Sequence, residues 1–221
     1  PVAVITDSNI APLYAESCGH TDAVITVPPG QQHKTLTTVQ SICEELVEKG
    51  FDRSTTVIAL GGSVISGLAG FVAATYMRGI DFVQCPTSLL AMVDASVGAK
   101  TGVDLPQGKN LVGAFKQPKA VIADVATLQS LSPEEFSSGM AEVIKHSLIA
   151  DPEQWARLQG LTALPATGWA EFILPSLKRF ASAQGACEAE FGKPARFKHF
   201  SRCGRLCKAR RLKRPWHIRT N

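Results

Sequence analysis

The fold is decided by residues 57–85, VIALGGSVISGLAGFVAATYMRGIDFVQC. The apolar run at residues 57–60 predicts a buried strand, and Gly61-Gly62 predicts a tight turn after it. Residues 68–76 are then expected to form a helix and residues 82–85 a second buried strand. This order predicts a strand–helix–strand unit with parallel strands.

The same alternation continues on both sides of this unit. Residues 2–6 and 23–27 are apolar runs that end in polar or proline-rich turns, and residues 121–123 form a further short run. Between residues 38 and 49 apolar side chains recur every three or four positions, which predicts an amphipathic helix. We therefore expect an α/β fold, with a parallel sheet covered by helices on both faces.

After the last of these strands the pattern changes to helix. Ser132 is a candidate N-cap, Pro133 suits the first helical position, and Glu135 stands where a capping box places its carboxylate. Residues 140–148 carry one apolar face, so the helix is expected to continue through them. We place a domain boundary near residues 128–132.

Length and composition restrict the class of protein. A chain of 221 residues with 45% hydrophobic content can bury a core, and it contains no apolar run long enough to predict a membrane span. Its six cysteines are expected to be reduced thiols in a cytoplasmic protein with no membrane partner. Because the chain begins at Pro1, without a Met or a signal peptide, we expect it to start inside a longer protein.

The charge is divided unevenly along the chain. Residues 178–221 contain 13 Lys and Arg against Glu188 and Glu190, a net charge of 13 − 2 = +11, whereas residues 1–177 carry 10 − 17 = −7. We expect residues 179–221 to be a basic tail that is disordered or non-native, for example through a frameshift. Nucleic-acid binding by this tail is the less favoured alternative. Cys203, Cys207 and nearby histidines fit no common zinc module.

Ligands of α/β sheets gather at the carboxyl ends of the strands, so the loops after Leu60 and Cys85 are the candidate site. Gly61-Gly62 would let backbone amides approach a pyrophosphate at the positive end of the following helix. The stretch does not match G-x-G-x-x-G, and a tight turn without a ligand is the alternative.

The second candidate segment is residues 86–110, PTSLLAMVDASVGAKTGVDLPQGKN. Asp94, Lys100, Lys109 and Asn110 would suit a polyanionic ligand, with lysines meeting phosphate or carboxylate and the aspartate handling a hydroxyl proton. A solvated polar loop is the alternative. Residues 98–101, GAKT, do not complete a phosphate-binding P-loop.

A family resemblance rests on residues 73–79 (AATYMRG), the whole of 86–110, 112–115 (VGAF) and 139–145 (GMAEVIK). This ordered series resembles 3-dehydroquinate synthase, and the likeness extends over roughly residues 1–178. It implies a Rossmann-like parallel-sheet NAD-binding domain at residues 1–130. The start of a truncated α-helical metal and substrate domain would follow at residues 131–178.

The resemblance also implies site residues. Substrate binding and catalysis would involve Arg78, Asp94, Lys100, Lys109, Asn110 and Lys145. Contacts with NAD would come from Asp7, Asn9, Gly30, Gln31, Lys34, Gly61, Gly62, Ser63, Gly67, Thr87, Ser88, Lys100, Lys109, Thr127 and Ser130. Glu142 would be a ligand of a catalytic Zn²⁺ or Co²⁺, although its spacing from Lys145 by itself predicts an ordinary helix-surface ion pair.

The implied activity is that of a lyase of the shikimate pathway. It converts 3-deoxy-arabino-heptulosonate 7-phosphate, a small sugar-phosphate substrate, to 3-dehydroquinate and phosphate, with NAD and zinc. The resemblance is compatible with a homodimer. The alternatives are a related NAD-dependent sugar-phosphate cyclase or polyol dehydrogenase, or a non-catalytic fragment with a nucleic-acid-binding tail.

Several positions depart from the family pattern. Ser63, Ser66 and Gly67 stand where the family has Gly, Gly and Asp, Gln31 replaces Glu, and Ala99 replaces Gly. A Cβ at position 63 or 66 can block the approach of a cofactor or force an unfavourable φ, so weaker NAD binding is expected. The two histidines that complete the family's metal site have no counterpart in this sequence. We therefore expect the activity of this chain to be impaired.

Overall fold

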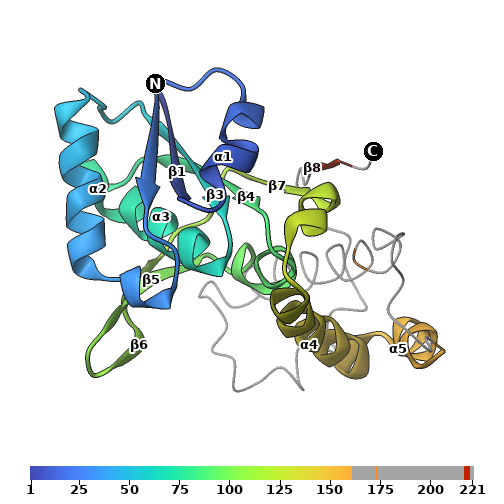
Figure 1. The fold of residues 1–221 in the computed structure, drawn as a ribbon. Coiled ribbons are helices and arrows are strands. Elements are labelled where there is room, and N and C mark those ends of the chain that lie inside the picture. Colours follow the sequence, from blue (N-terminus) through green and yellow to red (C-terminus); the bar gives the residue numbers. More distant parts are fainter. Residues whose placement is uncertain (161–172, 174–216, 220–221) are drawn as a thin grey trace.

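The computed structural model describes residues 1–160, residue 173 and residues 217–219 (Figure 1). Within them the main sheet has the order β2-β1-β3-β4-β7-β8, and every pair of neighbours is parallel. The predicted α/β class is therefore confirmed, and the predicted strands are present. The predicted strands have the bounds β1 (Val2–Asp7), β2 (Ala23–Val27), β3 (Thr56–Gly61), β4 (Asp81–Pro86) and β7 (Ala120–Asp124). The sixth strand, β8 (His217–Arg219), was not predicted, because it falls in the expected basic tail.

The connecting segments are mainly helical. The α-helices are α1 (Ala11–Tyr14), α2 (Leu36–Glu48), α3 (Ser63–Thr75), α4 (Pro133–Ala150) and α5 (Pro152–Gln159). Short 3₁₀ helices occur at η1 (Ala15–Cys18), η2 (Gln31–His33), η3 (Tyr76–Arg78) and η5 (Val125–Ser130), and η4 (Ala91–Ala95) is a short π-helix.

Helix α3 begins five residues before the predicted position. Gly62 takes an extended conformation as the N-cap, so the helix starts at Ser63, directly after the turn. Ser63 and Ser66 lie inside this helix, and neither has a positive φ. Of the two effects expected of a Cβ at these positions, the unfavourable φ is therefore wrong, and the blocked approach of the cofactor stays a prediction.

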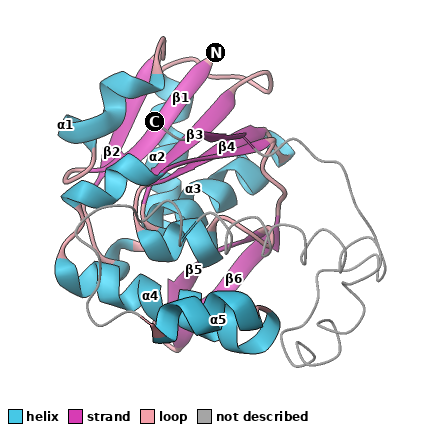
Figure 2. Ribbon diagram, turned by 90° about the vertical axis from the view of Figure 1, so that its right-hand side faces the viewer, coloured by secondary structure: helices cyan, strands magenta, loops and turns pink. Residues whose placement is uncertain are grey.

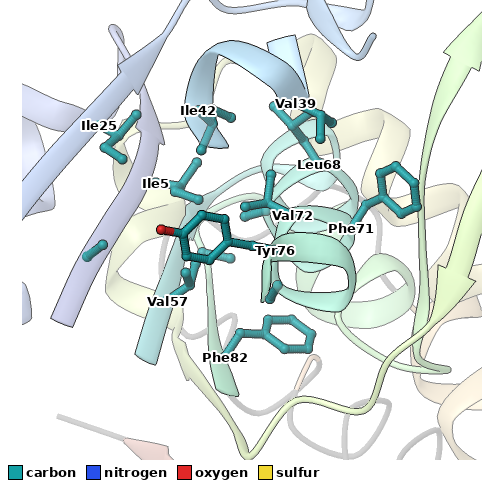
Figure 3. Close-up of a cluster of buried hydrophobic side chains, with 14 of the residues drawn as sticks. Ile5, Ile25, Val39, Ile42, Val57, Leu68, Phe71, Val72, Tyr76 and Phe82 are labelled. Atoms are coloured by element: carbon teal, nitrogen blue, oxygen red, sulfur yellow. The ribbon is translucent and has the colours of Figure 1, made fainter. Parts of the chain in front are cut away.

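The main core lies between the sheet and the helices α2 and α3 (Figure 3). Helix α3 is buried on most of its surface, and its side chains Leu68 and Val72 pack against Ile5 and Val57 of the sheet. At the end of the helix the hydroxyl of Tyr76 donates a hydrogen bond of 2.7 Å to the carbonyl oxygen of Phe51. Most of the apolar side chains in these runs thus form the interior, whereas Val24, Val47 and Ile122 are exposed.

Residues 86–110 are not a solvated loop throughout. They contain η4, and β5 (Lys100–Leu105) pairs with β6 (Gly108–Phe115) as an antiparallel hairpin. Figure 2 shows this hairpin apart from the main sheet, beside α3. Gly102 and Gly113 are opposite each other, and a Cβ at Gly102 would lie 2.6 Å from the carbonyl oxygen of Val112. The two glycines therefore permit close strand pairing and also obscure the strand periodicity.

Helix α4 is capped as predicted, because the Ser132 hydroxyl accepts a hydrogen bond from the Glu135 amide. Met140 and Val143 of α4 pack in a second buried cluster with Leu89 and Met92. Gly139 lies so close to the segment before η4 that a Cβ there would be 2.6 Å from the Cβ of Leu89. This close packing brings α4 to the carboxyl end of β4. The boundary near residues 128–132 stays a prediction.

Further predictions concern thiols, membranes and the tail. Cys18, Cys43 and Cys85 are free thiols, as expected. None of the helices in the described part combines the length and apolar character needed to cross a membrane. The predictions for residues 179–221 lie outside the described residues, apart from the backbone of β8. Cys187, His199, Cys203 and Cys207 are likewise outside them.

Candidate active site

Charged side chains from three elements meet where α4 packs on η4. Asp94 belongs to η4, and Lys100 is the first residue of β5. On α4 the Glu142 carboxylate forms an ion pair with Lys145 and lies 3.7 Å from Nε2 of His146. Asp94 and Lys100 are close enough to this group to interact electrostatically with it. We call Asp94, Lys100, Glu142, Lys145 and His146 the acid–base cluster.

Burial and mutual charge perturb the protonation of this cluster. Burial raises the pKa of Asp94, and the Glu142 carboxylate raises it further, against the opposite effect of Lys145 and Lys100. The pKa of Lys100 is lowered by burial despite the attraction of Asp94. His146, which is buried, has its pKa lowered by burial and by Lys145. Such environments move the pKa values of carboxyl and ammonium groups towards neutral pH, and groups with such pKa values can exchange protons.

A second polar group joins the hairpin to the segment before α2. The Lys34 ammonium donates a hydrogen bond of 2.6 Å to Oδ1 of Asn110, and Nε2 of Gln31 donates one of 2.6 Å to Oδ2 of Asp104. Burial lowers the pKa of Lys34, Asp104 raises it and Lys109 lowers it. We call Gln31, Lys34, Asp104, Lys109 and Asn110 the Lys34 network.

The two strand ends predicted to bind a ligand are adjacent. Gly61 is in register with Pro86, and the amide of Thr87 donates a hydrogen bond of 3.0 Å to the Gly61 carbonyl. A Cβ at Gly62 would be 3.4 Å from Oγ of Ser88. In the first turns of α3 the Ser66 hydroxyl is buried and has no hydrogen-bond partner among the described residues. A Gly-Gly turn that leads into the positive end of a 13-residue helix fits a pyrophosphate.

Other predicted cofactor contacts lie at neighbouring strand ends. Asp7 ends β1 and accepts hydrogen bonds from the amides of Asn9 and Ile10, at 2.9 and 3.1 Å. In η5, which follows β7, the Ser130 hydroxyl lies 2.9 Å from the Thr127 carbonyl oxygen, to which it donates. These loops leave the same edge of the parallel sheet as Gly61 and Pro86.

Arg78 lies away from the edge of the sheet that carries the acid–base cluster and the Lys34 network. It ends η3 with a φ of 66°, just before β4 begins, and so lies at the edge of the sheet opposite to Pro86. In the described part of the chain no salt bridge joins it to the acid–base cluster. The predicted role of Arg78 in substrate binding stays a prediction, as do the roles of the other site residues.

Two residues of these groups were missed by the sequence reasoning. His146 follows Glu142 by one helical turn, and this spacing was an available signal. Asp104 gave no comparable signal, since its partners Gln31 and Asn110 approach it only through the folding of the hairpin.

The described residues do not complete a metal site. Glu142 and His146 could together supply two ligands, but no three His, Cys, Asp or Glu side chains in residues 1–160, 173 and 217–219 could together hold a metal ion. A catalytic zinc usually has three protein ligands.

Two solved structures with a similar fold are synthases that bind NAD⁺ and a divalent metal ion. The fold is similar to that of a 2-deoxy-scyllo-inosose synthase complexed with carbaglucose-6-phosphate, NAD⁺ and Co²⁺, with a TM-score of 0.67 and 28% identity over 83% of this chain and 52% of that one. It is also similar to a 2-epi-5-epi-valiolone synthase from Streptomyces hygroscopicus with NAD⁺ and Zn²⁺ bound, with a TM-score of 0.74 and 27% identity over 89% and 56%.

Comparison of sequences identifies the family. Residues 24–138 match the model of the 3-dehydroquinate synthase N-terminal domain. The 3-dehydroquinate synthase of Symbiobacterium thermophilum is 56% identical over 68% of this chain and 44% of its own length, and that of Azotobacter vinelandii is 47% identical over 86% and 54%. The chain belongs to the 3-dehydroquinate synthase family. It spans about half the length of the curated relatives it matches.

Proposed function

We propose that this chain carries the dinucleotide-binding site and part of the catalytic site of a 3-dehydroquinate synthase. The reaction would convert 3-deoxy-arabino-heptulosonate 7-phosphate to 3-dehydroquinate and phosphate. One observation carries this proposal: the packing of α4 on η4 gathers Asp94, Lys100, Glu142 and Lys145 in one half-buried cluster. A cytoplasmic location and a homodimer are further predictions of the same assignment.

The cofactor would bind at the carboxyl edge of the sheet. Its pyrophosphate would lie on Gly61-Gly62 and the first turn of α3, where free amides and the helix dipole favour negative charge. We call this proposed binding site the dinucleotide crevice. It would continue past Thr87 and Ser88 towards the acid–base cluster. NAD⁺ bound there would supply the hydride acceptor.

The protein side chains would bind anionic oxygens and move protons. The ammonium groups of Lys100 and Lys145 suit the phosphate and carboxylate of the substrate. Asp94, whose pKa is raised by burial and by Glu142, can accept or return a hydroxyl proton. The partial exposure of this cluster leaves it accessible to a substrate, since the side chain of Lys145 is 41% exposed.

The second candidate is a cyclase that acts on glucose 6-phosphate. It is favoured by the fold similarity to 2-deoxy-scyllo-inosose synthase, whose bound carbaglucose-6-phosphate is an analogue of that sugar. The sequence identity is lower, 28% against 47–56% for the 3-dehydroquinate synthases. We therefore place this candidate second.

Calorimetric titration separates these candidates. The chain is titrated with NAD⁺ and then, with NAD⁺ present, with the heptulosonate phosphate or with glucose 6-phosphate. We expect NAD⁺ to bind, and the heptulosonate phosphate to bind at least about tenfold more tightly, because its extra carboxylate gives a further charge-assisted hydrogen bond. Failure to bind NAD⁺, or a preference for glucose 6-phosphate, would overturn the assignment.

Phosphate release measures the activity of this chain on its own. With NAD⁺ and zinc present, we expect the 221-residue chain to release phosphate from the heptulosonate at a very low rate. The reason is that Glu142 is its single predicted metal ligand. Turnover as fast as that of a full-length family member would show that the prediction of impaired activity is wrong.

A further inference from the structure

Asp104 holds together two segments that are far apart in the sequence. Its amide donates a hydrogen bond of 2.8 Å to the carbonyl of Lys34, and a parallel bridge joins it to Thr35. Its carboxylate accepts hydrogen bonds from Nε2 of Gln31 at 2.6 Å and from the amide of Asn110 at 2.7 Å. The backbone and the side chain of this one residue thus join the β5–β6 hairpin to the segment before α2.

Lys34 follows a path that depends on its neighbours. The residue is buried, and its ammonium reaches Oδ1 of Asn110. The side chain of Lys34 packs against Gly67, where a Cβ would lie 2.8 Å from Cε and 3.1 Å from Nζ of Lys34. Gly67 is in α3, the helix whose N-terminus is proposed to bind the dinucleotide. The lysine therefore lies along the proposed crevice, and the missing side chain at Gly67 leaves room for it.

The backbone of Asn110 has an unfavourable conformation, which a hydrogen bond to Asp104 helps to stabilise. It has a φ of 54°, in the left-handed region, which is unfavourable for a residue with a Cβ although asparagine tolerates it better than most. The hydrogen bond from its amide to Oδ1 of Asp104 offsets this cost. Asp104 thus helps to fix the backbone of the residue whose side chain accepts the Lys34 hydrogen bond.

We propose that Asp104 is a positioning residue, which holds the Lys34 ammonium and the Asn110 amide at the dinucleotide crevice. This inference rests on the proposed function. The carboxylate acts as counter-charge to Lys34 and Lys109, the cations of the Lys34 network. Neither Asp104 nor this role was among the sequence predictions.

The protonation of Lys34 supports the same role. Burial lowers the pKa of Lys34, Lys109 lowers it further, and Asp104 opposes both. Removal of the Asp104 charge should therefore let Lys34 lose its proton at a lower pH. A bound anion that contacts Lys34 would then be released at a lower pH as well.

The test is the affinity of the full chain for NAD⁺, measured by titration calorimetry from pH 7 to 10. Asp104→Asn keeps the shape and removes the charge. We expect about tenfold weaker binding and a fall in affinity that begins at lower pH, together with a lower thermal unfolding midpoint, because the amide nitrogen of Asn cannot accept one of the two hydrogen bonds. Asp81→Asn is the matched control, because it makes the same change in the exposed pair with Lys119, and its NAD⁺ affinity should equal that of the unchanged chain.

Asp104→Glu restores the charge and is expected to bind NAD⁺ within about threefold of the unchanged chain, which also decides the matter if Asp104→Asn does not fold. An Asp104→Asn variant with unchanged affinity and pH profile would overturn the inference while leaving the proposed function intact. The same holds for a folded Asp104→Glu variant that binds NAD⁺ about tenfold or more weakly than the unchanged chain. If the unchanged chain binds no NAD⁺, the proposed function fails, and this inference fails with it.

Discussion

Ala99 has a left-handed backbone conformation, with a φ of 55°, at the turn between η4 and β5. Gly98 before it also has a positive φ, of 98°. A Cβ disfavours this region because it crowds the following carbonyl oxygen. The strain lies one residue before Lys100, in the turn that positions this lysine beside Asp94.

Replacement of Ala99 by glycine should relieve this strain. We expect Ala99→Gly to raise the free energy of unfolding by about 1 kcal/mol, measured by urea denaturation. Ala141→Gly is the matched control, since Ala141 is exposed within α4 and its replacement should cost about 1 kcal/mol. If both variants lose stability, Ala99 is not strained as described.

At the scale of the element, α4 is positioned by its first turn and by its buried face. The cap at Ser132 fixes where the helix begins, and this determines which residues face η4. Met140 and Val143 then face the second cluster, while Glu142 and Lys145 face the site. The local signal at the start of the helix thus sets the register of Glu142 and Lys145.

Loss of the cap should weaken this element. We expect Ser132→Ala to lower the free energy of unfolding by about 1 kcal/mol, because the Glu135 amide loses its acceptor at 3.3 Å. Thermal or urea denaturation gives the measurement. In the control Ser137→Ala, an exposed serine inside α4 is replaced, and stability should rise slightly. Equal effects of the two substitutions would rule out a capping role.

At the scale of the whole molecule, α4 presents apolar side chains to solvent. Ile144, Leu148 and Ile149 are 38%, 59% and 47% exposed. They lie on the helix that carries Glu142, in a chain that spans about half the length of its relatives. Adjacent exposed apolar side chains favour association between molecules.

A charge in this patch should therefore reduce self-association. We expect Leu148→Glu to shift the chain towards smaller species in concentration-dependent light scattering, with little change in stability because the side chain is exposed. Leu13→Glu makes the same change at a leucine of α1 that is 54% exposed, and it should leave the scattering unaltered. Identical scattering by the two variants would contradict the role assigned to this patch.

Local patterns predicted most of the elements because their causes are local. Buried parallel strands appear as apolar runs, such as residues 57–60. Ser132 marks the start of a helix because its hydroxyl accepts a hydrogen bond from the amide of Glu135, three residues later. The hairpin of β5 and β6 was missed, because its pairing depends on residues opposite each other across the turn. Its facing glycines, Gly102 and Gly113, also remove the side chains that would show strand alternation.

The sequence by itself determined the α/β class, the order of the main elements and, through a family resemblance, the charged groups of the candidate site. Only the tertiary structure decided which of these groups share one space. Asp94 meets Glu142 because Gly139 lets α4 approach η4, and Asp104 meets Gln31 because the hairpin folds over α3. Electrostatic coupling and burial depend on distance in space, which chain spacing does not specify.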